Sequence, residues 1–402
     1  MAASMKKVAK IINLNIPIKN WTFQQSHLLQ NGRLNHFIPR VRLIHSKPIR
    51  QFPRRLLYAS TVTAAVGCGL AAYGGNLWRR LQPVVLADIG PEKPQKPQFE
   101  PIRRIKSETD NSGLKLTLYQ YQTCPFCCKV RAFLDYHGFS YDVVEVNSVW
   151  RTQLKWTKYP KVPVLVVDNV GENGFTQVND SSVIISCLET FLEDPSIPFD
   201  RIVSFYPPLE SEGKGKKKVF EYPNKYFVMY GDKKIKTTPD QRKEERRWRL
   251  WVDEDLVHML SPNIYRTPSE ALAAFRYFSK VGEWEKVFSA TERTVVIYVG
   301  ALAMFLVGKM LKNKYKLKDD VRESLYDDLN DWVKAVGSKR KFMGGDQPNL
   351  ADLNVYGALS AIEGCEAFED AKKNTKIDKW FSRMKTQVQS HAGAHPENKK
   401  LS

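Results

Sequence analysis

The chain has 402 residues, 43% of them hydrophobic, so it can hold two domains and additional extensions. Its formal net charge of +19 is concentrated at the N-terminus, because residues 1–87 contain 13 Lys or Arg and no Asp or Glu. The rest of the chain carries only +6 and no nucleic-acid-binding motif, so we expect no nucleic-acid partner. Six cysteines with one closely spaced pair favour a reducing compartment over secretion.

The N-terminal part predicts a membrane anchor. Residues 1–55 form a basic extension, typical of a mitochondrial transit segment and equally of a membrane-proximal arm. Residues 56–78 contain no charge and are long enough to span a bilayer as a single segment. Arginine pairs flank both of its ends, so charge does not define the orientation. Residues 79–113 are predicted to be a linker, because prolines recur between 91 and 101 and prevent regular structure.

A Cys-x-x-Cys motif lies between a predicted strand and a predicted helix. Leu114–Tyr119 alternates apolar and polar residues, which is typical of a strand. A helical pattern begins at Pro125 and ends at Gly138. Cys124 therefore lies at the mouth of a helix, where unpaired N–H groups and the helix dipole favour a thiolate, with Cys127 in the same turn. A strand, a Cys-x-x-Cys and a helix in this order indicate a thioredoxin-like redox or glutathione site.

Other uses of these cysteines are less well supported. A zinc site usually needs a second Cys or His pair, and the sequence offers none, so we expect no metal. The motif's spacing suits a reactive pair better than a structural disulfide. Cys128 is interpreted as a small packing residue.

The residues after the motif predict the remainder of one α/β domain at 114–200. Strands are expected at Tyr141–Val146, Val164–Val167 and Phe175–Val178, and a helix at Val183–Leu192. The order is β-α-β followed by β-β-α.

The second half of the chain reads as helical. Residues 201–239 are predicted to be a linker with an inserted hairpin, whose strands are Val219–Tyr222 and Tyr226–Tyr230. A helical domain is expected at 240–385 and a flexible tail at 386–402. Thr294–Gly308 is apolar but only 15 residues long, so it is predicted to be a buried helix. Asn349 and Asp352 have the spacing of a capping box that opens a helix.

Five stretches resemble the membrane-associated type 2 prostaglandin E synthase family, within the glutathione transferase superfamily. They are Tyr-Gln-Tyr-Gln-Thr-Cys-Pro-Phe-Cys at 119–127, Lys-Val-Pro at 161–163, Asn-Asp-Ser-Ser-Val-Ile-Ile-Ser at 179–186, Leu-Val-His-Met-Leu-Ser-Pro-Asn-Ile-Tyr-Arg-Thr-Pro at 256–268 and Phe-Met-Gly-Gly at 342–345. The stretch at 256–268 is the most specific, and the resemblance covers roughly 114–385. It implies an α/β thioredoxin (glutaredoxin)-like domain followed by an all-α glutathione transferase C-terminal-like domain, with a single N-terminal hydrophobic anchor.

The resemblance also implies roles for individual residues. Cys124 and Tyr121 would be catalytic, Cys127 a second thiol that the chemistry does not strictly require, and Phe126 a wall of the substrate pocket. Glutathione contacts would fall on Val162, Pro163, Asp180 and Ser181. The Val162–Pro163 bond is expected to be cis, so that the Val162 backbone can pair with a peptide ligand. Asp180 and Ser181 would offer helix N-terminal N–H groups to the γ-glutamyl end, and a plain N-cap is the alternative for Ser181.

The implied reaction is an isomerisation of prostaglandin H2 to prostaglandin E2, with glutathione bound and with haem as an inhibitory ligand. His258 is a candidate for the haem pocket, and a packed helix histidine is the alternative. The resemblance further implies a homodimer on the Golgi membrane, with a mitochondrial location as the alternative and a soluble form possible after cleavage. The competing functions are a glutathione-dependent thiol-disulfide oxidoreductase and a haem–glutathione binding protein with little turnover.

Overall fold

The computed structural model describes residues 98–212, 218–231, 235 and 237–394. These residues belong to one compact unit. The basic extension 1–55, the anchor predicted at 56–78 and residues 395–402 lie outside the described residues. Of the predicted tail, the first residues are helical, because the last helix runs to Gln389.

A five-stranded mixed sheet forms the first part of the fold. Its order is β1 (Arg103–Ile105), β3 (Tyr141–Glu145), β2 (Lys115–Gln120), β4 (Val164–Asp168) and β5 (Phe175–Asn179). β2 and β3 are parallel and are joined through helix α3 (Pro125–Tyr136), whereas β4 and β5 run antiparallel. This confirms the predicted β-α-β and β-β-α order. β1 is a difference, because it pairs with β3 where the sequence predicts a linker without regular structure.

The period of two along the strands divides the core between the two faces of the sheet. Leu116 and Leu118 of β2 join the main core, together with α3 and α4 (Ser181–Glu193). Tyr119 points to the opposite face and packs in a second cluster with Val164 and Phe175. The short 3₁₀ helix η1 (Thr152–Leu154) adds Leu154 to this second cluster.

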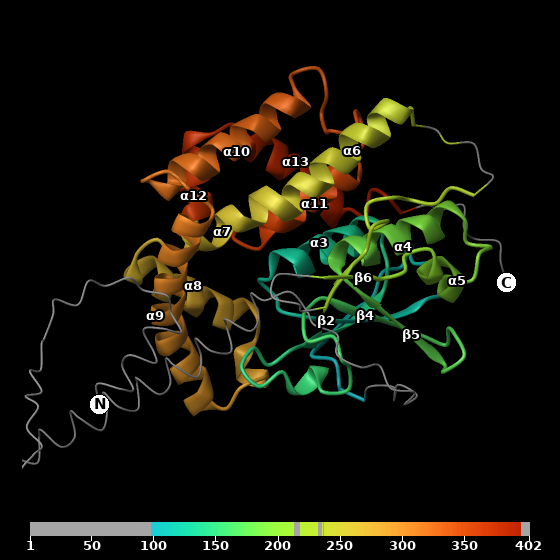
Figure 1. Ribbon diagram of the computed structural model, residues 1–402, viewed down its shortest axis with the longest axis horizontal. Coiled ribbons are helices and arrows are strands. Elements are labelled where there is room, and N and C mark those ends of the chain that lie inside the picture. Colours follow the sequence, from blue (N-terminus) through green and yellow to red (C-terminus); the bar gives the residue numbers. More distant parts are fainter. Residues whose placement is uncertain (1–97, 213–217, 232–234, 236, 395–402) are drawn as a thin grey trace, which may run out of the picture. The chain divides into compact units, whose positions relative to one another are not determined.

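An all-helical region follows the sheet and lies beyond α3, as Figure 1 shows. Its helices are α6 (Pro239–Trp251), α7 (Val257–Ile264), α8 (Pro268–Val281), α9 (Ala290–Lys314), α10 (Val321–Val336), α11 (Leu350–Ser360), α12 (Glu366–Asn374) and α13 (Ile377–Gln389). The π-helix η2 (Val252–Leu256) joins α6 to α7, and a 3₁₀ turn η3 (Trp284–Lys286) precedes α9. Asn349 and Asp352 form the predicted capping box at the start of α11.

Helix α11 crosses α3 at close range and fixes the two halves of the fold together. A Cβ added at Gly357 of α11 would lie 2.5 Å from the Cα and 2.7 Å from the backbone nitrogen of Lys129. Because these are backbone atoms of another helix, they cannot move aside as a side chain could, and the position requires glycine. The helix that carries the cysteines is therefore held directly against the helical region.

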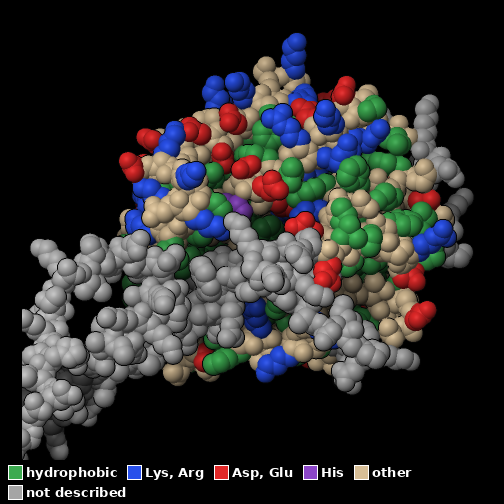
Figure 2. Space-filling view, viewed as in Figure 1, with side chains coloured by type: hydrophobic (Ala, Val, Ile, Leu, Met, Phe, Trp, Pro, Cys, Tyr) green, Lys and Arg blue, Asp and Glu red, His purple; other side chains and the backbone are tan. Residues whose placement is uncertain are grey.

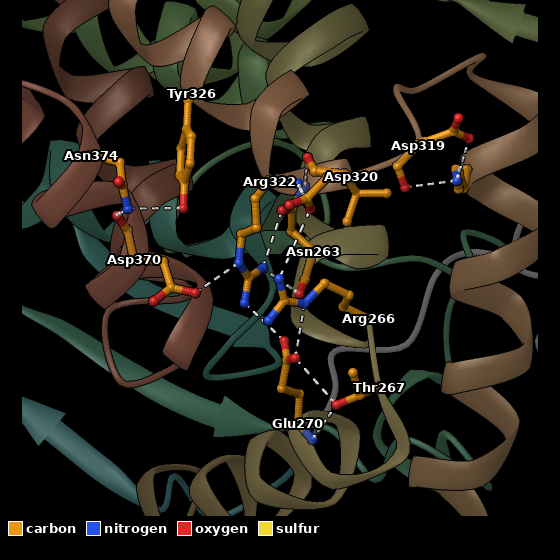
Figure 3. Close-up of polar contacts among 12 residues, drawn as sticks. Asn263, Arg266, Thr267, Glu270, Asp319, Asp320, Arg322, Tyr326, Asp370 and Asn374 are labelled. Atoms are coloured by element: carbon orange, nitrogen blue, oxygen red, sulfur yellow. Dashed lines mark hydrogen bonds and ion pairs between the residues drawn. The ribbon is translucent and has the colours of Figure 1, made fainter.

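A buried ion network joins four helices of this region (Figure 3). Arg322 of α10 is 1% exposed. Its guanidinium contacts Glu270 of α8 at 2.8 Å, Asp370 of α12 at 3.0 Å and the carbonyl oxygen of Asn263 of α7 at 2.7 Å. Glu270 in turn accepts a hydrogen bond from Arg266 at 2.9 Å. The network satisfies a charge that would be costly to bury alone.

The inserted hairpin is formed by a different pair of strands from the predicted pair. β7 (Lys218–Glu221) overlaps the first predicted strand, but its partner is β6 (Leu209–Glu212), which precedes it in the chain. Tyr226–Tyr230 is not a strand. Its backbone instead contacts α4 and the segment after it: the Met229 N–H donates a hydrogen bond to the Thr190 hydroxyl of α4, and the Tyr206 hydroxyl donates one to the Phe227 carbonyl. Tertiary contacts therefore override the strand propensity of this aromatic stretch.

Helix α9 is longer and more exposed than predicted. It spans 25 residues, and the prediction of a buried helix at Thr294–Gly308 is wrong for one face. Val295, Tyr298, Leu302 and Leu306 follow helical spacing and are 41–54% exposed. The opposite face packs on α7 and α8, and Gly300 lies against the ring of Phe275. Among the described residues, α9 is the one helix long and apolar enough to cross a membrane.

The surface seen in Figure 2 carries both signs of charge. Lys and Arg side chains are interspersed with Asp and Glu over the upper helices of this face. The basic character of the whole chain is therefore not gathered into a single positive field on this side of the described residues.

Candidate functional site

The strand-to-helix turn places Cys124 as the sequence predicts. Cys124 is the N-cap of α3, Pro125 occupies the first helical turn, and the Cys124 N–H donates to the Tyr121 carbonyl at 3.1 Å. A first-turn proline costs no helical hydrogen bond and is pre-set for the helix. Cys124 is half-buried and Cys127 fully buried, so the outer thiol can meet a ligand while the inner one cannot without rearrangement.

The two thiols are electrostatically unequal. The Cys127 S–H donates to the Cys124 sulfur and is the largest cause that lowers the pKa of Cys124. The N–H groups of Cys127 and Phe126 and the positive charge of Arg131 lower it further, against the opposing effect of burial. Burial raises the pKa of Cys127 well above its ordinary value, and the neighbouring Cys124 sulfur adds to this. Cys124 is therefore the thiol that ionises first, with Cys127 as its proton-bearing partner.

The other predicted residues of this turn flank the thiols. Tyr121 is half-buried and packs against the second cluster, as Val162 also does. Phe126 is half-buried and packs against the main core, with the Lys129 ammonium 5.5 Å from the centre of its ring. Their catalytic and substrate-lining roles stay predictions.

The loops expected to contact glutathione show one predicted backbone feature and depart from another. The Val162–Pro163 bond is cis, as expected. Asp180, not Ser181, is the N-cap of α4, because its side chain accepts hydrogen bonds from the N–H groups of Ser182 at 2.8 Å and Val183 at 3.4 Å. The N-cap alternative for Ser181 is therefore wrong. Ser181 is the first residue of the helix and is 4% exposed.

Three residues that the sequence did not single out connect these loops. The Asp180 N–H donates to the Tyr159 hydroxyl, and Tyr159 lies within electrostatic reach of Cys127. Lys225 approaches the Asp180 carboxylate at 3.8 Å. Lys161 also faces Asp180, and burial lowers the pKa of this lysine. Folding therefore brings the Cys124–Cys127 turn and the start of α4 together, with both lysines and the Asp180 carboxylate nearby.

A buried lysine ties this site to the helical region. Lys129 of α3 is fully buried and pairs with Asp253 of the π-helix η2. Asp253 also accepts hydrogen bonds from Ser182 at 2.7 Å and Tyr226 at 3.0 Å. A π-helix adds a residue to the turn and often marks a functional position. The Asp253 carboxylate of this π-helix holds α3 and the start of α4 together, because it contacts Lys129 of the first and Ser182 of the second.

Cys128 follows Cys127 on α3, whereas His258 lies on α7. Cys128 is buried, as predicted, and its sulfur accepts a hydrogen bond from Arg131 at 3.0 Å beside a cavity of about 230 Å³. The His258 ring stacks on Tyr315 with ring centres 4.3 Å apart, and burial lowers the pKa of this histidine. This geometry favours a packed helix histidine. Within the described ranges, no group of three or more His, Cys, Asp or Glu could hold a metal ion.

Comparison with known proteins places the chain in a family. The glutaredoxin family matches residues 116–171. A glutathione S-transferase structure from Rhodospirillum rubrum F11 is 18% identical to this chain, with 69% of this chain and 91% of that one covered and a TM-score of 0.36. A Danio rerio protein named Prostaglandin E synthase 2 is 44% identical over 345 residues, covering 84% of this chain and 86% of its own. A Mus musculus protein of the same name is 47% identical over 291 residues, covering 72% and 74%. With this identity over most of both chains, and with a glutaredoxin-like domain followed by an all-helical region, the chain belongs to the prostaglandin E synthase 2 family.

Proposed function

We propose that this chain isomerises prostaglandin H2 to prostaglandin E2 through the Cys124 thiolate. The observation that carries the proposal is the unequal thiol pair, in which the half-exposed Cys124 has the lowered pKa and the buried Cys127 donates to it. The names of the relatives from Danio rerio and Mus musculus supply the substrate class.

The thiolate attacks the endoperoxide oxygen on C9, and the weak O–O bond breaks heterolytically. Sulfur is then bonded to the C9 oxygen, and the C11 oxygen carries the negative charge. Loss of the C9 proton forms the C9 ketone and expels the thiolate, while the C11 alkoxide takes up a proton. Electrons balance without any external reductant, so one thiol suffices. The positive charge of Arg131 and the N–H groups at the start of α3 hold the thiolate before attack and after release.

The residues beside the thiol fit glutathione. Glutathione carries one ammonium and two carboxylates, and the Asp180 carboxylate with Lys161 and Lys225 offers complementary charges. Val162 and Pro163 would present backbone groups to the cysteinyl part, and Ser181 the start of α4 to the γ-glutamyl end. Bound glutathione would supply a second thiol and complete the wall of the pocket. His258, the candidate for a haem pocket, is stacked on Tyr315.

The remaining assignments extend this proposal. The proposed domains are a glutaredoxin-like domain at 114–200, to whose sheet β1 adds Arg103–Ile105, and a helical domain at 240–385, connected by 201–239. A homodimer, an anchor at 56–78 and a Golgi membrane location stay predictions.

The proposal is tested by steady-state turnover. Purified full-length protein in detergent micelles is expected to form prostaglandin E2 from prostaglandin H2 faster than spontaneous decomposition does, with saturation in substrate. A rate equal to decomposition, with and without glutathione, would contradict an isomerase.

A dithiol oxidoreductase is the second candidate, because the Cys124 and Cys127 sulfurs are already in hydrogen-bond contact. Two variants separate it from the isomerase. Cys127→Ser keeps a hydroxyl donor, so we expect most of the isomerisation to remain. Cys127→Ala removes the donor, so the pKa of Cys124 should rise and turnover at pH 7 should fall several-fold, recovering at higher pH. Iodoacetamide alkylation of Cys124 against pH measures the shift. Complete loss of turnover in both variants at every pH would favour the oxidoreductase.

Tyr121 is proposed to act on the substrate oxygen. The largest effects that lower the pKa of Cys124 come from Cys127, two backbone N–H groups and Arg131. Tyr121→Phe keeps the ring that packs on the second cluster and removes only the hydroxyl. We therefore expect an unchanged alkylation profile and a fall in turnover, roughly tenfold, across the pH range. An alkylation midpoint that moves upward would instead assign the hydroxyl to the thiolate.

A further inference from the structure

A buried carboxylate lies behind the turn that presents Cys124. Glu145 is the last residue of β3, is 3% exposed, and stands opposite Gln120 of the parallel strand β2. Its Oε1 accepts a hydrogen bond from the Gln122 backbone N–H at 2.6 Å, and its Oε2 accepts one from the Gln120 amide at 3.1 Å. Gln122 is two residues before Cys124. The carboxylate thus holds the peptide group through which the strand enters the reactive turn.

The same turn is held from its other side by Arg131. The guanidinium donates to the Gln122 carbonyl at 2.7 Å and to the Gln120 side-chain oxygen at 2.5 Å. Both backbone groups of Gln122 are therefore fixed, the N–H by an anion and the carbonyl by a cation. Arg131 is also one of the groups that lower the pKa of Cys124, so this clamp connects to the thiol.

We propose that Glu145 is a positioning residue for the reaction at Cys124, holding the Gln122 peptide so that the thiolate and the helix N–H groups keep their alignment. The inference rests on the proposed function, and it names a residue that touches neither thiol. A charge-assisted hydrogen bond from a backbone N–H is stronger than a neutral one, so the clamp depends on the charge of Glu145.

That charge changes near neutrality. Burial raises the pKa of Glu145 to about 7, against the opposing effects of the Gln122 N–H, Arg131, the Gln120 amide and Arg103. The charged groups that face it are Arg131 of α3 and Arg103 of β1, whose guanidinium is 3.8 Å from Glu145 and 3.5 Å from Glu283. Above pH 7 the carboxylate is charged and the Gln122 N–H is held strongly. Below pH 7 the protonated carboxyl is a weaker acceptor, so the turn loosens and the rate should fall.

The test compares Glu145→Gln with wild type and with Asp142→Asn, a control on the same strand whose carboxylate faces Arg104 at 3.8 Å. Wild type and the control are expected to lose turnover as the pH falls from 8 to 6, mainly in kcat. Glu145→Gln should be several-fold slower at pH 8, with similar KM and with no such pH dependence. Glu145→Asp, which keeps the charge, should restore part of kcat and the dependence on pH.

Alkylation of Cys124 by iodoacetamide supplies a readout that does not require prostaglandin turnover. In addition to the ionisation of Cys124 itself, wild type should show a change in alkylation rate near pH 7 that Glu145→Gln lacks. If this change is present but no prostaglandin E2 forms, the positioning role stands and the proposed function fails. A Glu145→Gln protein with the wild-type kcat and the wild-type pH profiles overturns the inference. Thermal unfolding shows whether Glu145→Gln folds. If it does not fold, Glu145→Asp is the test variant, and a wild-type kcat with an unshifted pH profile in that variant overturns the inference.

Discussion

Serine in place of Cys124 is expected to lower prostaglandin E2 formation by about 10³-fold or more, because a hydroxyl at this position does not ionise at neutral pH. Nothing else in the turn can replace it as nucleophile. Cys127 is fully buried with a raised pKa, and burial also raises the pKa of Cys128. The loss should persist at every pH, unlike that of Cys127→Ala, because the missing group cannot be recovered by titration.

The measurement is initial-rate turnover of the full-length variant, with thermal unfolding to confirm that the fold is intact. Cys365→Ser is a matched control, since that cysteine is buried at the start of α12 and plays no part in the proposed chemistry. Residual turnover above about a tenth of the wild-type rate in Cys124→Ser would assign the reaction to another group.

Methionine in place of Arg322 is expected to destabilise the fold by about 3–5 kcal/mol. The substitution keeps much of the aliphatic volume but removes the buried cation of the network. The buried Glu270 carboxylate then keeps only Arg266 as a partner, and Asp370 loses its ion pair (Figure 3). Total folding stability is typically 5–15 kcal/mol, so this loss is a large share of it. Urea unfolding of wild type and variant gives the difference.

Arg104→Met is the matched control for this effect. Arg104 also pairs with carboxylates, Glu100 at 3.4 Å and Asp142 at 3.8 Å, but its side chain is 61% exposed. An exposed pair contributes about 0–1 kcal/mol, so its removal should be nearly silent. Equal losses of stability in both variants would mean that burial does not increase the contribution of the Arg322 network to the free energy of unfolding.

The sequence predicts the reactive turn because its signals are local. The alternation before Cys124, the proline after it and the capping pattern at Asn349 each depend on neighbours within a few residues. The structure accordingly confirms the strand, the helix and the capping box. The cis bond at Val162 was expected from the family resemblance and is also present.

The parts that the sequence misses depend on contacts between distant residues. β1 has three residues, two of them arginine, and its pairing with β3 is decided by a free sheet edge that no local pattern marks. Lys129 and Asp253 are 124 positions apart, so their pairing follows only from the packing of α3 on the helical region. In the sequence, Glu145 is an ordinary polar residue of a strand, whereas in the fold it is buried and accepts a hydrogen bond from the Gln122 N–H in the turn after β2. The exposed face of α9 has the same apolar residues as a buried helix, so composition cannot distinguish them.

In the proposed mechanism one thiol isomerises the endoperoxide without net oxidation. Incubation of full-length wild-type protein with excess prostaglandin H2, without added reductant, allows product and free thiols to be measured together. We predict many equivalents of prostaglandin E2 per chain, with the free-thiol count unchanged at the end. A stoichiometric loss of the Cys124 and Cys127 thiols, accompanied by the reduced diol product instead of the ketone, would contradict the isomerase and identify a dithiol reductase.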